Sequence, residues 1–538
     1  MKYIELFAGC GGLSLGLESA GYELCFANEL SPMASETFAY NILNEDFEHI
    51  AQNSNSELKK ALWISSQYPK EELNRRLREN PQQYPALKEG YSDLPTKLKE
   101  LDGKLLIGSI IQLNKFLDSN KSFEREIRVA DIDLVSGGPP CQSFSLAGMR
   151  QLDNARNTLP MDFAEFVGRT KPKVALLENV SGILRAFNTG GRKYYAWFEV
   201  AKAFASKGYY PICLHINAKY TGAAQNRPRF ILVALRKDIF EGLLKANESL
   251  EPVIKELLKE SKSFFVKESK NIATQPYIDL NYYDIEKNDE LFRSPLFSPF
   301  LKHTDSELFS VKDAIDDLRE NRGKRSASKY SEYLDKQLKK LRNSKLAEKE
   351  IANSKLRKTS PIPTMRFRLY QILSIAAGNG LKAVEKETVK YLKTQANEFI
   401  SDSTIAYLMK QNLLNSDGKT LANFSKKSQV LKYLSMLATK KQTQRALIAN
   451  KPAPAALSIP DDACHYDIRL PRTLTIREMA RFQSFPDWFV FRSKETTGGQ
   501  MRKFEVPQYT QIGNAVPPLL GKALGEVVKR ILRISQTT

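Results

Sequence analysis

The sequence is poor in cysteine, and none of its cysteines has the spacing of a metal-binding or disulfide pair. The five cysteines are scattered over 538 residues, with no Cys-x-x-Cys motif. Zinc sites and disulfide frameworks depend on clustered cysteines, so we expect neither and predict no bound metal. The sequence also lacks any run of about 18 apolar residues, the length that a membrane helix needs. These absences favour a cytoplasmic protein with no membrane partner.

The beginning of the sequence has no features of a secretory signal. Residues 3–7 form a strand-like run, and no charged segment followed by an apolar one precedes them. The hydrophobic content of 42% is ordinary for a globular protein, so the chain can bury a sizeable core. We therefore expect a protein of several domains and no signal peptide.

Acidic residues are too few to balance the basic ones. The formal net charge is +20, and the excess of lysine and arginine is densest over residues 321–370. This balance favours a polyanionic partner such as nucleic acid, whose phosphates the basic stretch would contact. We predict such contacts for Lys324 and Arg325. Arg366 and Arg368, on either side of Phe367, are predicted to read base edges.

Strand-like and helix-like segments alternate through the first part of the chain. A helix is expected at 13–20, and the expected strands are 3–7, 22–27, 132–136, 174–177, 212–216 and 230–235. This alternation is typical of an α/β domain with a mostly parallel sheet. A polar stretch at 41–104, with helical patterning at 58–63 and 73–77, is expected to be a peripheral helical insert. After about residue 237 the strand rhythm stops, and a Lys-rich, partly helical region follows.

The first expected strand leads into a glycine-rich turn. Phe7, Gly9, Gly11 and Gly12 stand where the strand gives way to a helix, so the backbone can approach a ligand and the helix offers free N–H groups. Glu29 ends the next strand and is placed to bind ribose hydroxyls. A nucleotide-like cofactor is one interpretation, and a dehydrogenase or a structural glycine turn are the others. The spacing of the glycines departs from the GxGxxG pattern of dehydrogenases.

The most informative segment is the stretch Gly137-Gly138-Pro139-Pro140-Cys141. A strand delivers Cys141 through a stiff turn with polar flanks, so its thiol is expected to face a cleft. The other four cysteines are interpreted as small buried apolar residues. One reaction that needs a cysteine in such a cleft is methylation of cytosine at C5. C5 is a poor nucleophile until a thiolate adds at C6, so Cys141 could be that thiolate.

Two further strand ends carry groups that suit the same chemistry. Glu178 follows an apolar strand and can share a proton with N3 of a pyrimidine. Arg227 and Arg229 lie on one face at the start of another strand, where a guanidinium can hold the O2 carbonyl and stabilise a thiolate. Taken singly, each of these residues could equally be a solvated strand-end charge.

Together these segments resemble the DNA (cytosine-5) methyltransferase family, and they occur in that family's order. The segment from Phe7 to Gly12 resembles its cofactor loop, and Glu29 its ribose acid. The stretches 139–142, 178–180 and 225–229 are similar to its nucleophile, acid and QxRxR motifs. Residues 472–487 resemble the segment that supports target recognition, and 511–518 the last motif. The resemblance covers roughly residues 1–240 and 460–535.

The resemblance implies a Rossmann-like class I methyltransferase fold with a second, smaller target-recognition domain. It implies a catalytic domain at 1–240, a target-recognition domain at 241–500 and a C-terminal segment at 501–538 that returns to the first. S-adenosyl-L-methionine would be the cofactor, and the further contacts to it would come from Ser109, Ile110, Pro139, Asn514 and Val516. Double-stranded DNA would be the substrate, contacted by Gln142, Arg150, Arg156, Arg472 and Arg477.

The resemblance also implies a reaction and a biological setting. The target cytosine would be flipped out of the duplex, Cys141 would add to its C6, Glu178 would bond N3 and the N4 amine, and Arg229 would hold O2. The chain would be a monomeric modification enzyme paired with a restriction endonuclease.

One departure and two alternatives remain. Where the family has Gly-Asp-Ile, with the acid on the cofactor adenine, this chain has Gly108-Ser109-Ile110. A tRNA cytosine-5 methyltransferase would carry much the same motifs but resembles a minimal version without the long region before residue 460. A non-catalytic DNA-binding relative would be expected to have lost Cys141 or Glu178, and both are present.

Overall fold

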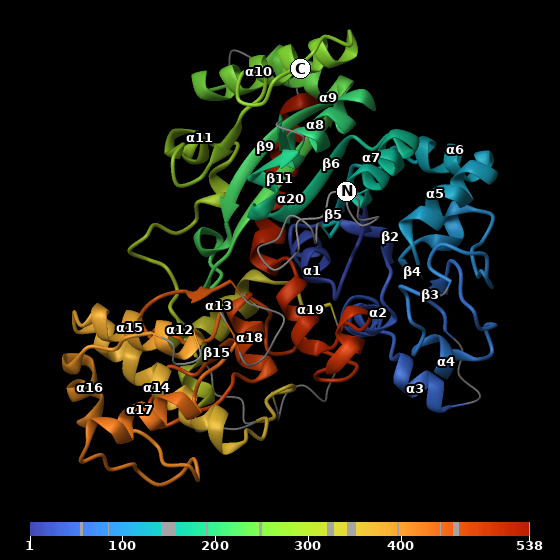
Figure 1. Cartoon of the computed structure of the whole chain (residues 1–538). Coiled ribbons are helices and arrows are strands. Elements are labelled where there is room, and N and C mark those ends of the chain that lie inside the picture. The colour runs from blue at the N-terminus through green and yellow to red at the C-terminus, as the bar shows by residue number, and fades with distance from the viewer. Residues whose placement is uncertain are drawn as a thin grey trace.

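The computed structural model describes residues 1–53, 58–83, 85–140, 158–189, 192–246, 250–319, 328–341, 351–394, 398–441, 443–455 and 462–536. Over these residues the chain folds into one large sheet covered by helices and a separate group of helices to one side of it (Figure 1). No helix within these ranges has both the length and the apolar character of a membrane span.

The large sheet has nine strands in the order β12-β9-β11-β6-β5-β1-β2-β4-β3. All neighbours are parallel except β11, which runs antiparallel to β6 and β9. The predicted α/β fold with a mostly parallel sheet is confirmed. The strands are β1 (Lys2–Leu6), β2 (Glu23–Glu29), β3 (Ala61–Trp63), β4 (Lys104–Ile107), β5 (Leu134–Gly137), β6 (Val174–Val180), β9 (Tyr209–Asn217), β11 (Pro228–Arg236) and β12 (Tyr282–Asp284).

The insert at 41–104 differs from its prediction. Residues 58–63 were expected to be helical, but Ala61–Trp63 form the edge strand β3, which pairs with β4 at the end of the insert. A strand of three residues is too short to show an alternating pattern, and the apolar run suits either structure. The helical prediction at 73–77 is confirmed by α4 (Leu73–Arg76). The insert therefore extends the sheet.

Helices cover both faces of the sheet. On one face, α1 (Gly12–Ser19), α9 (Lys237–Lys245) and α20 (Pro518–Gln536) share a core with Tyr3, Val174 and Leu176. On the other face, α5 (Ile110–Ser119), α6 (Lys121–Val129), α7 (Leu159–Thr170) and α8 (Ala196–Ser206) pack on Ile4 and Leu6. Side chains along β1 point alternately to the two faces of the sheet and so contribute to both cores, as expected for a sheet with helices on both faces.

The C-terminal helix α20 lies directly against α1. A Cβ on Gly16 would stand 2.4 Å from the backbone oxygen of Pro518, so only glycine permits this approach. Gly525 on α20 likewise faces Ala20 and Leu17. Helix α20 is in this way packed against the first helix of the sheet, and the assignment of residues 501–538 as a separate segment stays a prediction.

Residues just beyond 240 also pack on the large sheet. Helix α10 (Pro252–Ser269) contributes Ile254 and Leu257 to the same core as Tyr210, and β12 pairs with β9. The division of the chain at residue 240 remains a prediction, and these contacts favour a later boundary.

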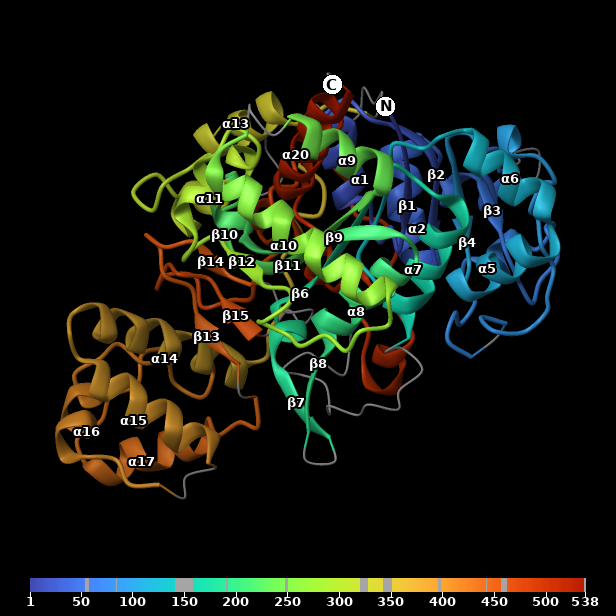
Figure 2. The ribbon, with the colours of Figure 1, turned by 90° about the horizontal axis from the view of Figure 1, so that it is seen from above.

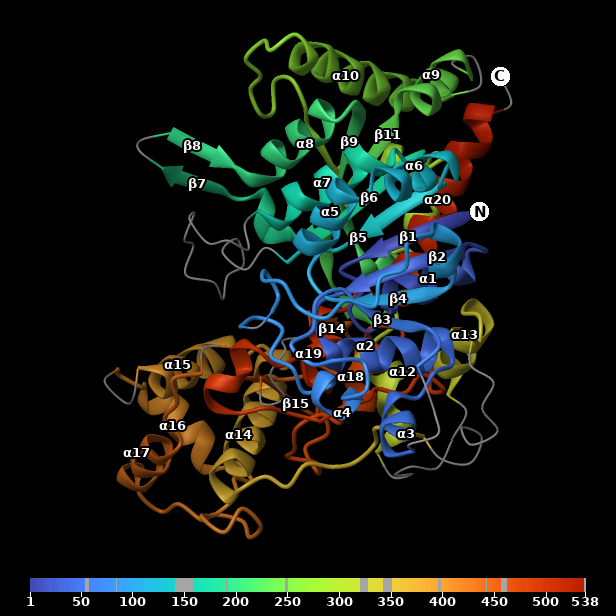
Figure 3. The ribbon, with the colours of Figure 1, turned by 90° about the vertical axis from the view of Figure 1, so that its right-hand side faces the viewer.

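Four helices form a lobe with a core of its own. They are α14 (Pro361–Gly378), α15 (Lys382–Lys393), α16 (Asp402–Met409) and α17 (Lys427–Met436). The lobe lies to one side of the sheet (Figure 2) and is also seen apart from it in Figure 3. A further core contains residues of α12 (Val311–Ile315), α13 (Lys329–Gln337), α18 (Ile476–Phe482) and α19 (Gln508–Asn514), together with Cys10 and Leu15 from the first part of the chain.

Candidate active site

A cavity of about 610 Å³ lies at the carboxyl ends of the central strands. The order of strands reverses between β1 and β5, and in open α/β sheets ligands bind at this switch point. The loops after β1 and β5 both line the cavity, through Phe7 and Gly138 respectively. Its wall also contains residues from the insert and from near the C-terminus.

The glycine-rich turn after β1 is held in left-handed backbone conformations. Phe7, Gly9 and Gly11 have φ angles of 55°, 56° and 94°, and such a conformation is costly at a residue other than glycine, here Phe7. Phe7, Gly9 and Gly12 line the cavity. Gly11 stands at the N-cap of α1, where a Cβ would come within 3.0 Å of the side chain of Ile42.

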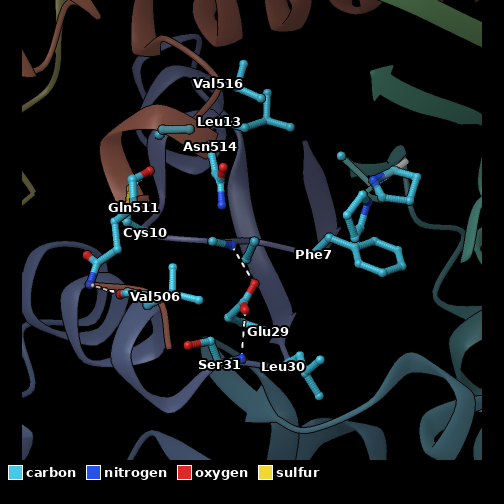
Figure 4. Close-up of a pocket in the computed structure, with 18 of the residues that line it drawn as sticks. Phe7, Cys10, Leu13, Glu29, Leu30, Ser31, Val506, Gln511, Asn514 and Val516 are labelled. Atoms are coloured by element: carbon cyan, nitrogen blue, oxygen red, sulfur yellow. Dashed lines mark hydrogen bonds between the residues drawn. The ribbon is translucent and has the colours of Figure 1, made fainter. Parts of the chain in front are cut away.

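Glu29, at the end of β2, is fixed by two backbone amides. The N–H of Gly9 donates to Oε2 over 2.8 Å, and the N–H of Ser31 donates to Oε1 over 2.7 Å (Figure 4). Burial raises the pKa of this carboxyl above its ordinary value, while the same backbone N–H groups act against that shift. Each carboxylate oxygen keeps a further lone pair, so the group can still accept a bond from a ligand hydroxyl.

The turn after β4 brings Ser109 and Ile110 to the cavity wall. The side-chain amide of Asn28 donates to the carbonyl of Gly108 over 3.0 Å and so ties this turn to β2. The hydroxyl of Ser109 accepts from the N–H of Ile111 over 3.2 Å and caps α5. The Asp expected from the family is thus replaced by a short side chain that already bonds its own helix.

The chain returns to the cavity at the end of α19. Asn514 and Val516 line the wall (Figure 4), and a Cβ on Gly12 would lie 2.3 Å from the carbonyl oxygen of Val516. Gln511 holds this segment in place. Its amide donates to the carbonyl of Val506 over 3.0 Å, and its carbonyl accepts from the hydroxyl of Thr37 over 2.6 Å.

Glu178 and Arg229 form a buried ion pair in the cavity wall. Nε of Arg229 lies 2.7 Å from Oε1 of Glu178, and both residues are more than 90% buried. Burial lowers the pKa of Arg229, whereas Glu178 acts in the opposite direction. The pair joins neighbouring strands, because Glu178 lies on β6 and Arg229 on β11.

Arg227 lines the cavity and also binds the segment near the C-terminus that closes it. Its Nη2 donates to the carbonyls of Gly513 and Ala515 over 2.8 and 2.9 Å, and the residue is 1% exposed. Burial lowers the pKa of this guanidinium well below its ordinary value. Arg227 therefore ties the QxRxR segment to the last motif, and it lines the same cavity as Asn514. Its action on the base stays a prediction.

Cys141 lies outside the described residues, together with Gln142, Arg150 and Arg156. The turn that leads to it is described. The side-chain amide of Asn179 donates to the carbonyl of Pro139 over 3.0 Å, and a Cβ on Gly138 would stand 3.0 Å from Oε2 of Glu178. The chain therefore approaches position 141 along the cavity wall, beside the acid.

The structure describes only some of the residues that are predicted to contact DNA. Lys324 and Arg325 lie outside the described residues. Arg366 donates to the carbonyl of Leu437, and Arg368 to that of Asn412, over 2.9 Å each, so both guanidinium groups bind within the helical lobe. Base-edge contacts by these two arginines stay a prediction.

Arg472 and Arg477 both bond to groups of the protein itself. Arg472 donates two bonds to Glu478, over 2.8 and 2.7 Å. Arg477 is fully buried and donates to the carbonyls of Ala352 and Pro486, and burial lowers its pKa to about 10. Direct DNA contact by either stays a prediction, and the complete burial of Arg477 argues against it at that residue. We interpret both arginines as supports of residues 472–487.

Several cavity residues were not predicted from the sequence. Asn179 and Gln511 stand inside motifs that were identified, so their positions could have been inferred. Leu30, Ser31, Phe504 and Val506 have no motif around them, and neither have Pro81 and Gln82 of the insert.

Comparisons with known proteins agree with this geometry. A family model described as C-5 cytosine-specific DNA methylase matches residues 1–66 and 109–530. The type II methyltransferase M.DdeI of Desulfomicrobium norvegicum is 25% identical over 527 residues, covering 98% of this chain and 88% of its own. M.Bpa9945I of Bacillus paralicheniformis is 25% identical over 561 residues, covering 99% of each chain. M.NgoPII of Neisseria gonorrhoeae is 32% identical over 240 residues, 44% of this chain and 49% of its own.

Proposed function

The chain belongs to the C-5 cytosine-specific DNA methylase family, and we propose that its cavity binds S-adenosyl-L-methionine beside a flipped cytosine on which Cys141 and Glu178 act. The enzyme is a DNA (cytosine-5) methyltransferase. One observation carries the proposal: a single cavity joins the Glu29 loop, the Glu178–Arg229 pair and the turn before Cys141.

The residues of the cavity suit this methyl donor. A volume of about 610 Å³ falls in the usual range for a small-molecule site. The carboxylate of Glu29 would accept from the ribose hydroxyls, and the turn from Phe7 to Gly12 would present backbone N–H groups to the charged amino-acid end. Ile110, Pro139 and Val516 would enclose the apolar parts of the donor. When bound, the donor supplies an electrophilic methyl group.

Glu29→Ala is expected to weaken binding of S-adenosylhomocysteine by about 10- to 100-fold, the range for losing bonds to a charged group. The change removes the acceptor for ribose and leaves the N–H groups of Gly9 and Ser31 without their present partner. Calorimetric titration measures the effect. Glu23→Ala, an exposed position at the other end of β2, is the matched control. Equal affinity for both variants and the wild type would refute this site.

The catalytic residues would act on the base in sequence. The thiolate of Cys141 forms a bond to C6, and the ring electrons move toward C5. Glu178 would stabilise the ring by sharing a proton with N3. Arg229, which contacts Oε1 of Glu178, would hold O2 of the base. After methylation, loss of the C5 proton and breakage of the S–C6 bond restore the aromatic ring. The base must leave the stack for this attack, because C6 is shielded inside duplex DNA.

The helical lobe is the best candidate for reading the target sequence. It has its own core and lies apart from the sheet, so its surface can vary without disturbing the cavity (Figure 2). We place the specificity determinants in α14–α17, supported by residues 472–487, with DNA between lobe and sheet. This is narrower than the predicted 241–500, because α10 and β12 pack on the sheet.

Replacing residues 361–441 by the corresponding lobe of a relative with another target should change the methylated sequence. The core of the lobe, to which Ala446 and Cys464 also contribute, is separate from the cores of the sheet, so a chimera can keep the catalytic cavity intact. Sequencing of the methylated positions in plasmid DNA measures the outcome. An active chimera that keeps the original target would contradict this assignment.

The names of the relatives favour a role in restriction-modification. We propose that the protein acts as a monomer in the cytoplasm and protects DNA against a cognate restriction endonuclease. Plasmid DNA from an expressing host should then resist cleavage by an endonuclease that recognises the methylated sequence.

A further inference from the structure

The cavity wall includes a segment that the family model does not match. Pro81 and Gln82 line the cavity, and both lie between the two matched stretches 1–66 and 109–530. We propose that this segment is part of the methyl-donor site and that the amide of Gln82 binds the adenine edge of the donor. The inference rests on the proposed donor, S-adenosyl-L-methionine.

The topology places the segment next to Ser109. Strands β3 and β4 are parallel, with Trp63 opposite Ile107, so the loops that follow them emerge side by side at the carboxyl edge. The N–H of Ile64 donates to the carbonyl of Ile107 over 2.9 Å. A Cβ on Gly108 would stand 3.0 Å from Cβ of Ile64. The segment that begins after β3 therefore starts in contact with the turn that carries Ser109.

The segment is anchored by a buried arginine. Arg76 is 1% exposed, and its Nε donates to the carbonyls of Tyr68 and Pro69 over 2.9 Å each. Its Nη1 pairs with Asp93 over 2.5 Å, and its guanidinium lies 5.2 Å from the ring centre of Trp63 on β3. Arg76 thus holds residues 68–69 and Asp93 together beside the edge strand β3.

A second set of bonds shapes the chain between Arg76 and Gln82. The carboxylate of Glu79 accepts from the hydroxyl of Ser66 over 2.5 Å and from the N–H of Gln67 over 2.8 Å. The carboxamide of Asn80 then accepts from the N–H of Gln82 over 3.0 Å, which is the bond of an Asx turn. Gln82 is therefore presented to the cavity by a built turn.

The chemistry of an amide suits the missing contact. In the family an acid binds adenine from the position of Ser109, but here the serine hydroxyl caps α5. An amide offers an acceptor and two donors, and glutamine can pair with the exocyclic amine and a ring nitrogen of adenine together. Gln82 would in this way supply the adenine contact that the acid makes in the family.

The test compares two ligands and two glutamines. S-adenosylhomocysteine carries the adenine amine, and S-inosylhomocysteine has an oxygen in its place. Gln82→Ala should weaken binding of S-adenosylhomocysteine by about 10-fold and reduce the preference for it over the inosine analogue. Gln83→Ala is the matched control, because Gln83 is an exposed neighbour in the same turn and does not line the cavity. It should bind both ligands as the wild type does. Calorimetric titration gives the affinities, and thermal melting verifies that each variant is folded.

The outcomes separate this inference from the proposed function. If the wild type binds S-adenosylhomocysteine and Gln82→Ala binds it equally well, the inference is overturned and the donor site stands. If Gln82→Ala weakens both ligands alike, the contact with the adenine edge is overturned. If the wild type binds neither ligand, the proposed donor fails, and the inference fails with it.

Discussion

Cys141→Ala is expected to abolish methyl transfer to DNA. Without a thiolate to add at C6, C5 of cytosine stays too weak a nucleophile to take the methyl group. Transfer of a labelled methyl group to duplex DNA measures the loss. Binding of DNA should persist, because the rest of the protein surface that would bind it is unchanged.

The matched control for this variant is Cys25→Ala. Cys25 is buried on β2 and does not line the cavity, so its replacement removes a thiol without touching the proposed chemistry. This variant should retain methyl transfer near the wild-type rate. Turnover by a folded Cys141→Ala protein would show that the reaction needs no cysteine at this position.

Glu178→Gln is expected to lower the single-turnover rate by about 10²- to 10⁴-fold. Glutamine can keep a bond to Arg229, so the wall should remain in place, but an amide cannot share a proton with N3. Rapid-quench measurement of methyl transfer gives the rate. The matched control is Glu199→Gln. Glu199 forms a partly exposed ion pair with Lys202 and does not line the cavity, so this change should leave the rate unaltered. A rate for Glu178→Gln within a few-fold of wild type would leave Glu178 with a structural role only.

The central strands were predictable because each combines an apolar run with a turn signal at its carboxyl end. Phe7 to Gly12 after β1 and the Gly-Gly-Pro-Pro turn after β5 are examples, and the structure places both at one cavity. The edge strands β3 and β12 were not predicted from the sequence. Each has three residues, and such short runs carry no alternation to distinguish strand from helix.

The roles of the arginines could not be inferred from the sequence. For Arg227, predicted to act on the base, nothing in the sequence indicated its bonds to the carbonyls of Gly513 and Ala515, nearly 300 residues further along the chain. Arg477 was predicted to contact DNA, yet its guanidinium is buried among backbone carbonyls. A positive charge in a sequence indicates affinity for oxygen atoms. It does not indicate whether those atoms are phosphates or the protein's own carbonyls.

Gln82 illustrates a further limit. No motif surrounds it, and the sequence of the insert gives no sign that its middle reaches the cavity. What brings it there is the pairing of β3 with β4 and the burial of Arg76, both of which depend on contacts across the fold.

The central claim is that this protein methylates C5 of cytosine in DNA through Cys141. Bisulfite sequencing of plasmid DNA from a host that expresses the protein tests it most directly, because 5-methylcytosine resists deamination. We expect protected cytosines at one recurring sequence with the wild-type protein and none with Cys141→Ala. Complete conversion of cytosine in DNA from cells that contain folded wild-type protein would contradict the claim, and so would equal protection by the alanine variant.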